Sequence, residues 1–137
     1  MSLFTEQKIN IADSNLVTAG NIKCSGPGGI GYAIGAGSTV TQATSRTTGV
    51  TINALCGAIT LLSAAGPNGT AFSFTVTNNA VAASDVVIVS QKSGTDVYTV
   101  QAVTNVVAGS FKLTLNAAGN TVEQPVFNFA VIKAVTA

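Results

Sequence analysis

The sequence predicts an all-β protein, in which an antiparallel β-sandwich or barrel-like domain follows an extended, glycine-rich N-terminal arm. From Gly49 onward, apolar and polar residues alternate in the way that gives a strand one buried face. The alternating segments are rich in Val, Thr and Phe, and turns containing Gly and Asn separate them. No segment of this region has the spacing of an amphipathic helix. Short connections between the segments favour antiparallel neighbours.

About seven segments have this strand pattern. In chain order they are residues 50–55, 58–64, 71–78, 86–91, 97–107, 111–116 and 125–135. The first two flank Cys56-Gly57, where we expect a tight reversal. The third alternates Phe72 and Phe74 with Ser and Thr, so that its aromatic side chains face a core.

The last four segments complete the predicted sheets. The fourth, VVIVSQ, begins with consecutive apolar residues, as in a strand buried on both faces. The fifth places Tyr98, Val100 and Ala102 on one side, and the remaining two alternate apolar side chains with polar ones. We therefore expect one common core that contains Phe72, Phe74, Phe111, Leu113, Phe127 and Phe129.

The organisation of the chain changes near residue 47. Residues 26–37 are GPGGIGYAIGAG, a segment with few side chains to bury and a large loss of backbone entropy on ordering. We therefore expect an extended N-terminal arm at residues 1–47 and an antiparallel β domain at residues 48–137. Apolar residues along the arm predict that it becomes ordered on neighbouring subunits. They are Phe4, Ile9, Ile11, Leu16, Val17, Ile22, Ile30, Tyr32 and Ile34.

Charged residues are unusually rare. They make up 8% of the chain, against about 25% in an ordinary soluble protein, while hydrophobic residues make up 47%. A surface this poor in charge predicts that other subunits cover much of it. The net charge is +1 and the Lys and Arg residues are dispersed, so we expect no nucleic-acid partner. The sequence shows neither a long apolar stretch nor a signal-peptide pattern, so we expect no membrane partner and no Sec export.

Residues that perform catalysis are scarce. The sequence contains no His, which is the commonest general base. Its acids are Glu6, Asp13, Asp85, Asp96 and Glu123. Asp85 and Asp96 lie at strand boundaries, where Asp commonly closes a turn, although they could also face each other across a hairpin. We expect a protein that is not an enzyme, with no cofactor and no metal, and we assign no catalytic, cofactor-binding or metal-binding residue.

Two further patterns have ordinary explanations. Gly26, Gly28 and Gly31 match G-x-G-x-x-G, but the residues after them cannot open a stable helix. We interpret these glycines as part of the arm. Cys24 and Cys56 are too few for a disulfide framework, and zinc would need further ligands, so we expect two reduced cysteines.

Three segments of the chain carry a resemblance to a known family. They are residues 35–65, 73–115 and 123–135, and TQATSRTTGVT and FNFAVIK are their most specific parts. These segments resemble a family of small virion proteins of tailed phages and prophages. The resemblance runs from Gly35 to the end of the chain, and the residues before Gly35 are the variable part.

The resemblance implies a structural virion protein without a catalytic motif. Related sequences resemble capsid cement or decoration subunits, or distal domains of tail and head fibres, and both kinds are typically homotrimers. Because no fibre shaft precedes the β domain, we expect a cement subunit that stabilises the head by binding the major capsid protein as a homotrimer. The alternative is a fibre or tail-tip component that attaches to the host surface. In either case, the protein would be made in the bacterial cytoplasm and located on the phage particle.

Overall fold

The computed structural model describes residues 27–134 and contains no helix among them. The chain divides into two units, residues 1–31 and residues 32–137, and every described strand lies in the second unit. The prediction of an all-β protein is therefore confirmed for the described residues.

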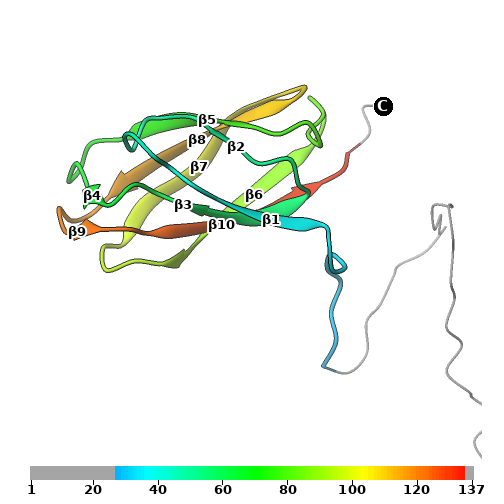
Figure 1. The fold of residues 1–137 in the computed structure, drawn as a ribbon, viewed down its shortest axis with the longest axis horizontal. Helices are drawn as coiled ribbons and strands as arrows, with labels where there is room; N and C mark the ends of the chain where they lie inside the picture. Colours follow the sequence, from blue (N-terminus) through cyan, green and yellow to red (C-terminus); the bar gives the residue numbers. More distant parts are fainter. Residues whose placement is uncertain (1–26, 135–137) are drawn as a thin grey trace, which may run out of the picture. The chain divides into compact units, whose positions relative to one another are not determined.

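Ten strands are present in this part of the chain (Figure 1). They are β1 (Gly37–Thr41), β2 (Val50–Thr51), β3 (Cys56–Thr60), β4 (Ala64–Ala65), β5 (Phe72–Thr77), β6 (Val86–Ser93), β7 (Tyr98–Val107), β8 (Ser110–Ala117), β9 (Val122–Glu123) and β10 (Val126–Ile132). One four-stranded sheet has the order β1-β3-β10-β6, and the other has the order β2-β5-β8-β7. Figure 1 shows these sheets as two layers, and the short β4-β9 pair lies at one end of them.

Most neighbouring strands are antiparallel, as the short connections predict. The exceptions are the two edge pairs β1–β3 and β2–β5, which are parallel. Both result from the path of the chain, because β1, β2 and β3 belong alternately to the two sheets. A strand that returns to its own sheet after such a crossover can run parallel to its neighbour.

The core lies between the two sheets and contains the predicted residues. All six are buried, with relative exposures of 8% or less: Phe72, Phe74, Phe111, Leu113, Phe127 and Phe129. The Tyr98 ring meets the Phe127 ring edge-on, with the ring centroids 5.0 Å apart. The alternating sequence pattern thus identifies these core side chains correctly. Burial of each one contributes roughly 1.5–3 kcal/mol of transfer free energy.

The tight reversal expected at Cys56-Gly57 is not present. Both residues lie inside β3, between β1 and β10. A Cβ atom on Gly57 would lie 2.3 Å from the carbonyl oxygen of Ser38 and 3.1 Å from the Phe129 ring. Gly57 is therefore explained by the close approach of β1 to β3 rather than by a turn.

Two strands near the sheet edges also differ from the expected burial. Val86 and Ile88 of β6 are each 52% exposed, because the core lies between the two sheets and covers only one face of each. Tyr98 is 2% exposed but Val100 is 37% exposed, since the register of β7 shifts between these residues. The irregularity places Tyr98 and Val100 on different faces, contrary to the simple alternation.

The compact unit begins earlier in the chain than residue 48. Its first strand, β1, pairs with β3 along its whole length, and Gln42 and Arg46 are buried. Contact clustering starts this unit at Tyr32. The Gly- and Thr-rich sequence of β1 lacks clear alternation, so its pairing with β3 was not predicted. The expected arm residues 1–26 lie outside the described residues.

Candidate functional site

The acidic residues that the sequence suggests for chemistry are held apart by the fold. Asp85 directly precedes β6 and Asp96 follows it, so their carboxylates lie at opposite ends of that strand. Asp96 accepts hydrogen bonds from the backbone N–H and the hydroxyl of Thr121, at 2.9 and 2.6 Å. Glu123 accepts hydrogen bonds from the backbone N–H groups of Thr95 and Asp96. These carboxylates therefore stabilise turns and do not form an acid–base pair.

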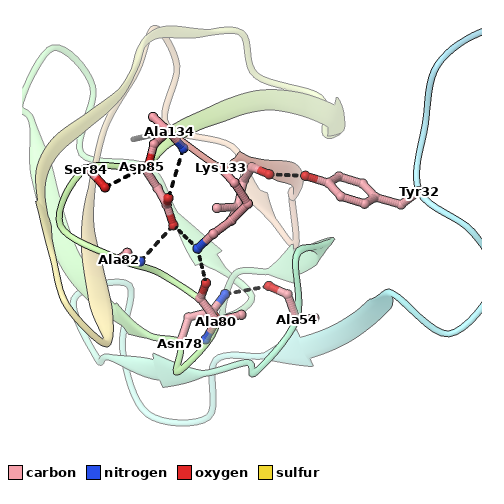
Figure 2. Close-up of polar contacts among 10 residues, drawn as sticks. Tyr32, Ala54, Asn78, Ala80, Ala82, Ser84, Asp85, Lys133 and Ala134 are labelled. Carbon is pink, nitrogen blue, oxygen red and sulfur yellow. Dashed lines mark hydrogen bonds and ion pairs between the residues drawn. The ribbon is translucent and has the colours of Figure 1, made fainter. Parts of the chain in front are cut away.

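Asp85 closes a turn and also binds a lysine (Figure 2). Its carboxylate accepts the backbone N–H of Ala82 at 2.7 Å and the backbone N–H of Ala134 at 3.3 Å. It forms an ion pair with Lys133, whose ammonium also donates to the carbonyl of Ala80. The Ala82 N–H, followed by the Lys133 ammonium, holds the pKa of the Asp85 carboxyl below its usual value of 3.8. Asp85 thus links the turn before β6 to the chain that follows β10.

Arg46 is buried in a polar network at the other end of the sandwich. Its guanidinium donates hydrogen bonds to the carbonyls of Leu62 (2.8 Å), Ala64 and Glu123 (2.8 Å) and to the Tyr98 hydroxyl. Burial raises the pKa of Tyr98 above its usual value of 10.0. The network fixes the 42–48 loop against the body of the domain. It also gives a structural role to the Arg in the most specific segment of the family resemblance.

The described residues contain neither a cluster of metal ligands nor a membrane-spanning helix. Within residues 27–134, no three acidic or cysteine side chains come close enough together to hold a metal ion. In the same part of the chain, there is no helix of the length and apolar character that crossing a bilayer requires. Cys56 lies in β3 and is partly buried. Cys24 lies outside the described residues, so the expectation of two reduced cysteines stays a prediction.

One end of the β1-β3-β10-β6 sheet is apolar on its outer face, the side away from the core. The register pairs Val86 with Ile132 and Ile88 with Ala130, so their side chains share this face. Val86, Ile88 and Ile132 are 52%, 52% and 50% exposed. We call these four residues the apolar outer patch. Adjacent exposed apolar side chains of this kind are typical of interaction surfaces.

The chain entering the domain lies close to the apolar outer patch. The Tyr32 hydroxyl donates a hydrogen bond to the carbonyl of Val131, the residue before Ile132 (Figure 2). The backbone N–H of Val131 is bonded to the carbonyl of Leu55 at 2.8 Å, just before β3 begins. Tyr32 thereby donates a hydrogen bond to a carbonyl of β10 at a position to which the neighbouring strand β3 does not extend.

A shallow hollow of about 430 Å³ occupies another part of the same outer face. Its lining comes from β1, β3 and β10 and includes Gly37, Thr39, Cys56, Ala58 and Asn128. No charged side chain lines it. The hollow is therefore a smooth depression between small residues, without the converging polar groups that orient a small-molecule ligand.

The apolar outer patch is not predicted from the sequence, although the run VVIV that begins at Val86 indicates an additional apolar surface. The uninterrupted run VVIV was interpreted as a strand with two covered faces. The structure covers one of these faces with the core and leaves the other exposed. An apolar run on an edge strand therefore indicates a surface that a further partner can cover.

Comparison of the chain with models of protein families, with curated proteins and with solved structures gives no match. The candidate functional site is accordingly defined by geometry alone. It consists of the outer face of the β1-β3-β10-β6 sheet, with its apolar patch, its hollow and its free edge at β1.

Proposed function

We propose that this chain is a structural subunit of a tailed-phage particle, a capsid cement or decoration protein that binds the major capsid protein as a homotrimer. The observation that carries the proposal is the apolar outer patch on a chain with only 8% charged residues. An exposed apolar surface on such a charge-poor protein is stabilised when a partner covers it. The family resemblance supplies the kind of particle.

The polar clusters of the domain also favour a structural role. The side chains of Arg46, Asp85, Asp96 and Glu123 are engaged with the backbone of loops and turns. Arg46, Asp85 and Glu123 are buried, and buried polar groups that are bonded in this way specify and rigidify a fold. A rigid domain with the apolar outer patch suits a protein that functions by assembling with other subunits.

Localisation in purified phage particles tests the proposed function directly. Antibody labelling or electron cryo-microscopy should place the protein on the capsid, in groups of three, and its removal should make heads less stable. Label on the tail would instead support a fibre or tail-tip component. Absence of the protein from purified particles would overturn both virion roles.

A single substitution tests the part that the apolar outer patch plays. Replacing Ile88 with Lys places a charge in the patch and should weaken binding to undecorated heads by at least about tenfold, or 1.4 kcal/mol. Thr75→Lys is a matched control, because Thr75 is an exposed strand residue of the other sheet. Equal binding by Ile88→Lys and the wild type would remove the patch from the interface.

A further inference from the structure

The edge of the first sheet at β1 carries main-chain groups that no other part of the described chain binds. β1 is the last strand of its sheet and pairs only with β3. The backbone N–H of Gln42 donates to the carbonyl of Thr60 at 2.9 Å. Because alternate residues of a strand point their N–H and C=O groups to opposite sides, Ser38 and Val40 also bond toward β3. The N–H and C=O groups of the other residues of β1 therefore point toward the free edge.

Three residues present these outward groups: Gly37, Thr39 and Thr41. Within residues 27–134, no turn, loop or side-chain hydrogen bond reaches them. The side chains of this strand are also largely exposed, and only Val40 is partly buried. The result is an open edge that can accept another strand.

Several of the devices that commonly protect a sheet edge are missing from β1. The strand, GSTVT, contains no charge and no Pro, and its pairing with β3 shows no bulge. The opposite edge, at β6, is treated differently. There the Gln101 side chain of β7 accepts the backbone N–H of Gln91 in β6 at 2.5 Å. A side chain thus occupies a backbone group at the β6 edge, whereas no side chain of the described residues bonds to the outward groups of β1.

We infer that β1 pairs with β1 of a second copy of this chain, antiparallel and about a two-fold axis at Thr39. In an antiparallel ladder, directly opposed residues exchange two hydrogen bonds at every second position. With Thr39 opposite Thr39 of the second copy, Gly37 lies opposite Thr41 of that copy. This register uses every outward N–H and C=O group of both strands.

The ends of β1 and its side chains fit this self-pairing. The chain turns just before the strand, where Ala36 N–H bonds to the carbonyl of Ala33 and Gly35 has a φ of 95°. Just after the strand, Gln42 enters the buried network. The paired segment is thereby limited to five residues with outward groups on the first, third and fifth. Gly37 leaves space for the opposing Thr41, and no like charges meet across the axis.

The pairing joins two four-stranded sheets into one continuous sheet. It is an isologous contact, in which the same surface is used by both copies. The inference goes beyond the proposed function and does not depend on it. One two-fold contact joins two single chains, and three such contacts join two of the proposed trimers when they all form between the same pair, so loss of the contact halves the mass of either closed assembly.

Charge substitutions at Thr39 test the inference, because the axis places this residue opposite itself. Thr39→Lys and Thr39→Glu should each halve the mass measured by light scattering at micromolar concentration, since like charges face each other. An equimolar mixture of the two variants should restore the wild-type mass through opposite charges. Thr75→Lys, on an exposed strand of the other sheet, should keep the wild-type mass.

A backbone variant provides an independent measurement. Thr39→Pro removes an outward N–H while leaving the hydrogen bonds toward β3 in place, so it should fold, as judged by circular dichroism, and have half the mass. The inference is overturned if the wild type has the same mass as Thr39→Lys, or if the Lys and Glu variants fail to restore the larger mass on mixing. Decoration of heads by the half-mass variants, measured separately, distinguishes this contact from the proposed capsid interface.

Discussion

At the scale of single residues, the guanidinium of Arg46 connects parts of the domain that are distant in the sequence. It bonds to carbonyls of the 61–65 segment and of β9, and to the hydroxyl of Tyr98 in β7. Removal of this side chain leaves several buried acceptors without a donor. Each such loss is worth on the order of 1–3 kcal/mol.

We therefore predict that Arg46→Met lowers the free energy of unfolding by about 2–4 kcal/mol. Urea denaturation followed by circular dichroism measures the change. Lys112→Met is the matched control, because Lys112 is an exposed cation on β8 and its loss should change stability by less than about 0.5 kcal/mol. A similar, small effect of both substitutions would show that the Arg46 network does not stabilise the domain.

Asp85 makes the stability of the protein depend on acid pH. Its pKa is lowered in the folded state, first by the Ala82 N–H and then by Lys133, so the folded protein favours the carboxylate. The stabilising contribution is present above the usual pKa of 3.8 and is lost as the pH falls below that value. Asp85→Asn should lower the melting temperature at pH 7 and reduce its fall between pH 5 and about pH 2.5.

Thermal melts of both proteins across this pH range provide the measurement. Lys133→Met should change the same profile in the same direction, because it removes one of the groups that lower the pKa of Asp85. Parallel pH profiles for the wild type and Asp85→Asn would contradict the assignment.

At the scale of elements, β3 shows what the alternating pattern can and cannot reveal. The strands around Phe72, Phe111 and Phe127 were predicted because their side chains alternate between a core and solvent. The interpretation of Gly57 as part of a turn was wrong. This position requires glycine because the carbonyl of Ser38 lies close to it, and the sequence pattern does not show that contact. The same limit applies to β1, whose position depends on pairing with β3 rather than on its own apolar residues.

Gly57→Ala should therefore loosen β1 from β3. The new Cβ would lie 2.3 Å from the Ser38 carbonyl and 3.0 Å from the Ile52 side chain, so the strands must separate or the core must shift. We expect a loss of about 1–3 kcal/mol in the free energy of unfolding. Hydrogen exchange should accelerate at the amides of Val40 and Gln42, which face β3.

A glycine in open space is the control for this substitution. A Cβ on Gly29 would meet no atom within 4 Å, so Gly29→Ala should leave both the stability and the exchange rates unchanged. Unchanged exchange at Val40 in Gly57→Ala would show that β1 tolerates the side chain.

At the scale of the whole molecule, the sequence predicted the all-β class, the core and most of the long strands. The surface that we propose for assembly was less accessible to sequence reasoning. The run containing Val86 and Ile88 suggested two covered faces, and only the two-layer arrangement, with the core on one face of each sheet, shows that the other face is exposed. Burial by a second molecule leaves the same sequence pattern as burial inside one molecule.

The folded domain starts earlier in the structure than the sequence pattern predicts. The pattern places the domain at residues 48–137, whereas the compact unit begins at Tyr32 and includes β1. Gln42 supports the earlier start, because its side chain donates to the carbonyls of Arg46 and Thr48 and accepts the backbone N–H of Leu62. A chain that begins at residue 48 lacks both Gln42 and Arg46.

We predict that a chain of residues 32–137 melts cooperatively, within a few degrees of the full-length protein, because it keeps every described strand. A chain of residues 48–137 should melt at least about 10 °C lower, since the loss of the Arg46 network alone removes about 2–4 kcal/mol and each kcal/mol shifts a domain of this size by about 4–8 °C. Thermal melts of the two truncated chains provide the comparison. Equal melting temperatures would place the domain boundary at residue 47 after all, because β1 and its loop would then contribute nothing to the stability of the fold.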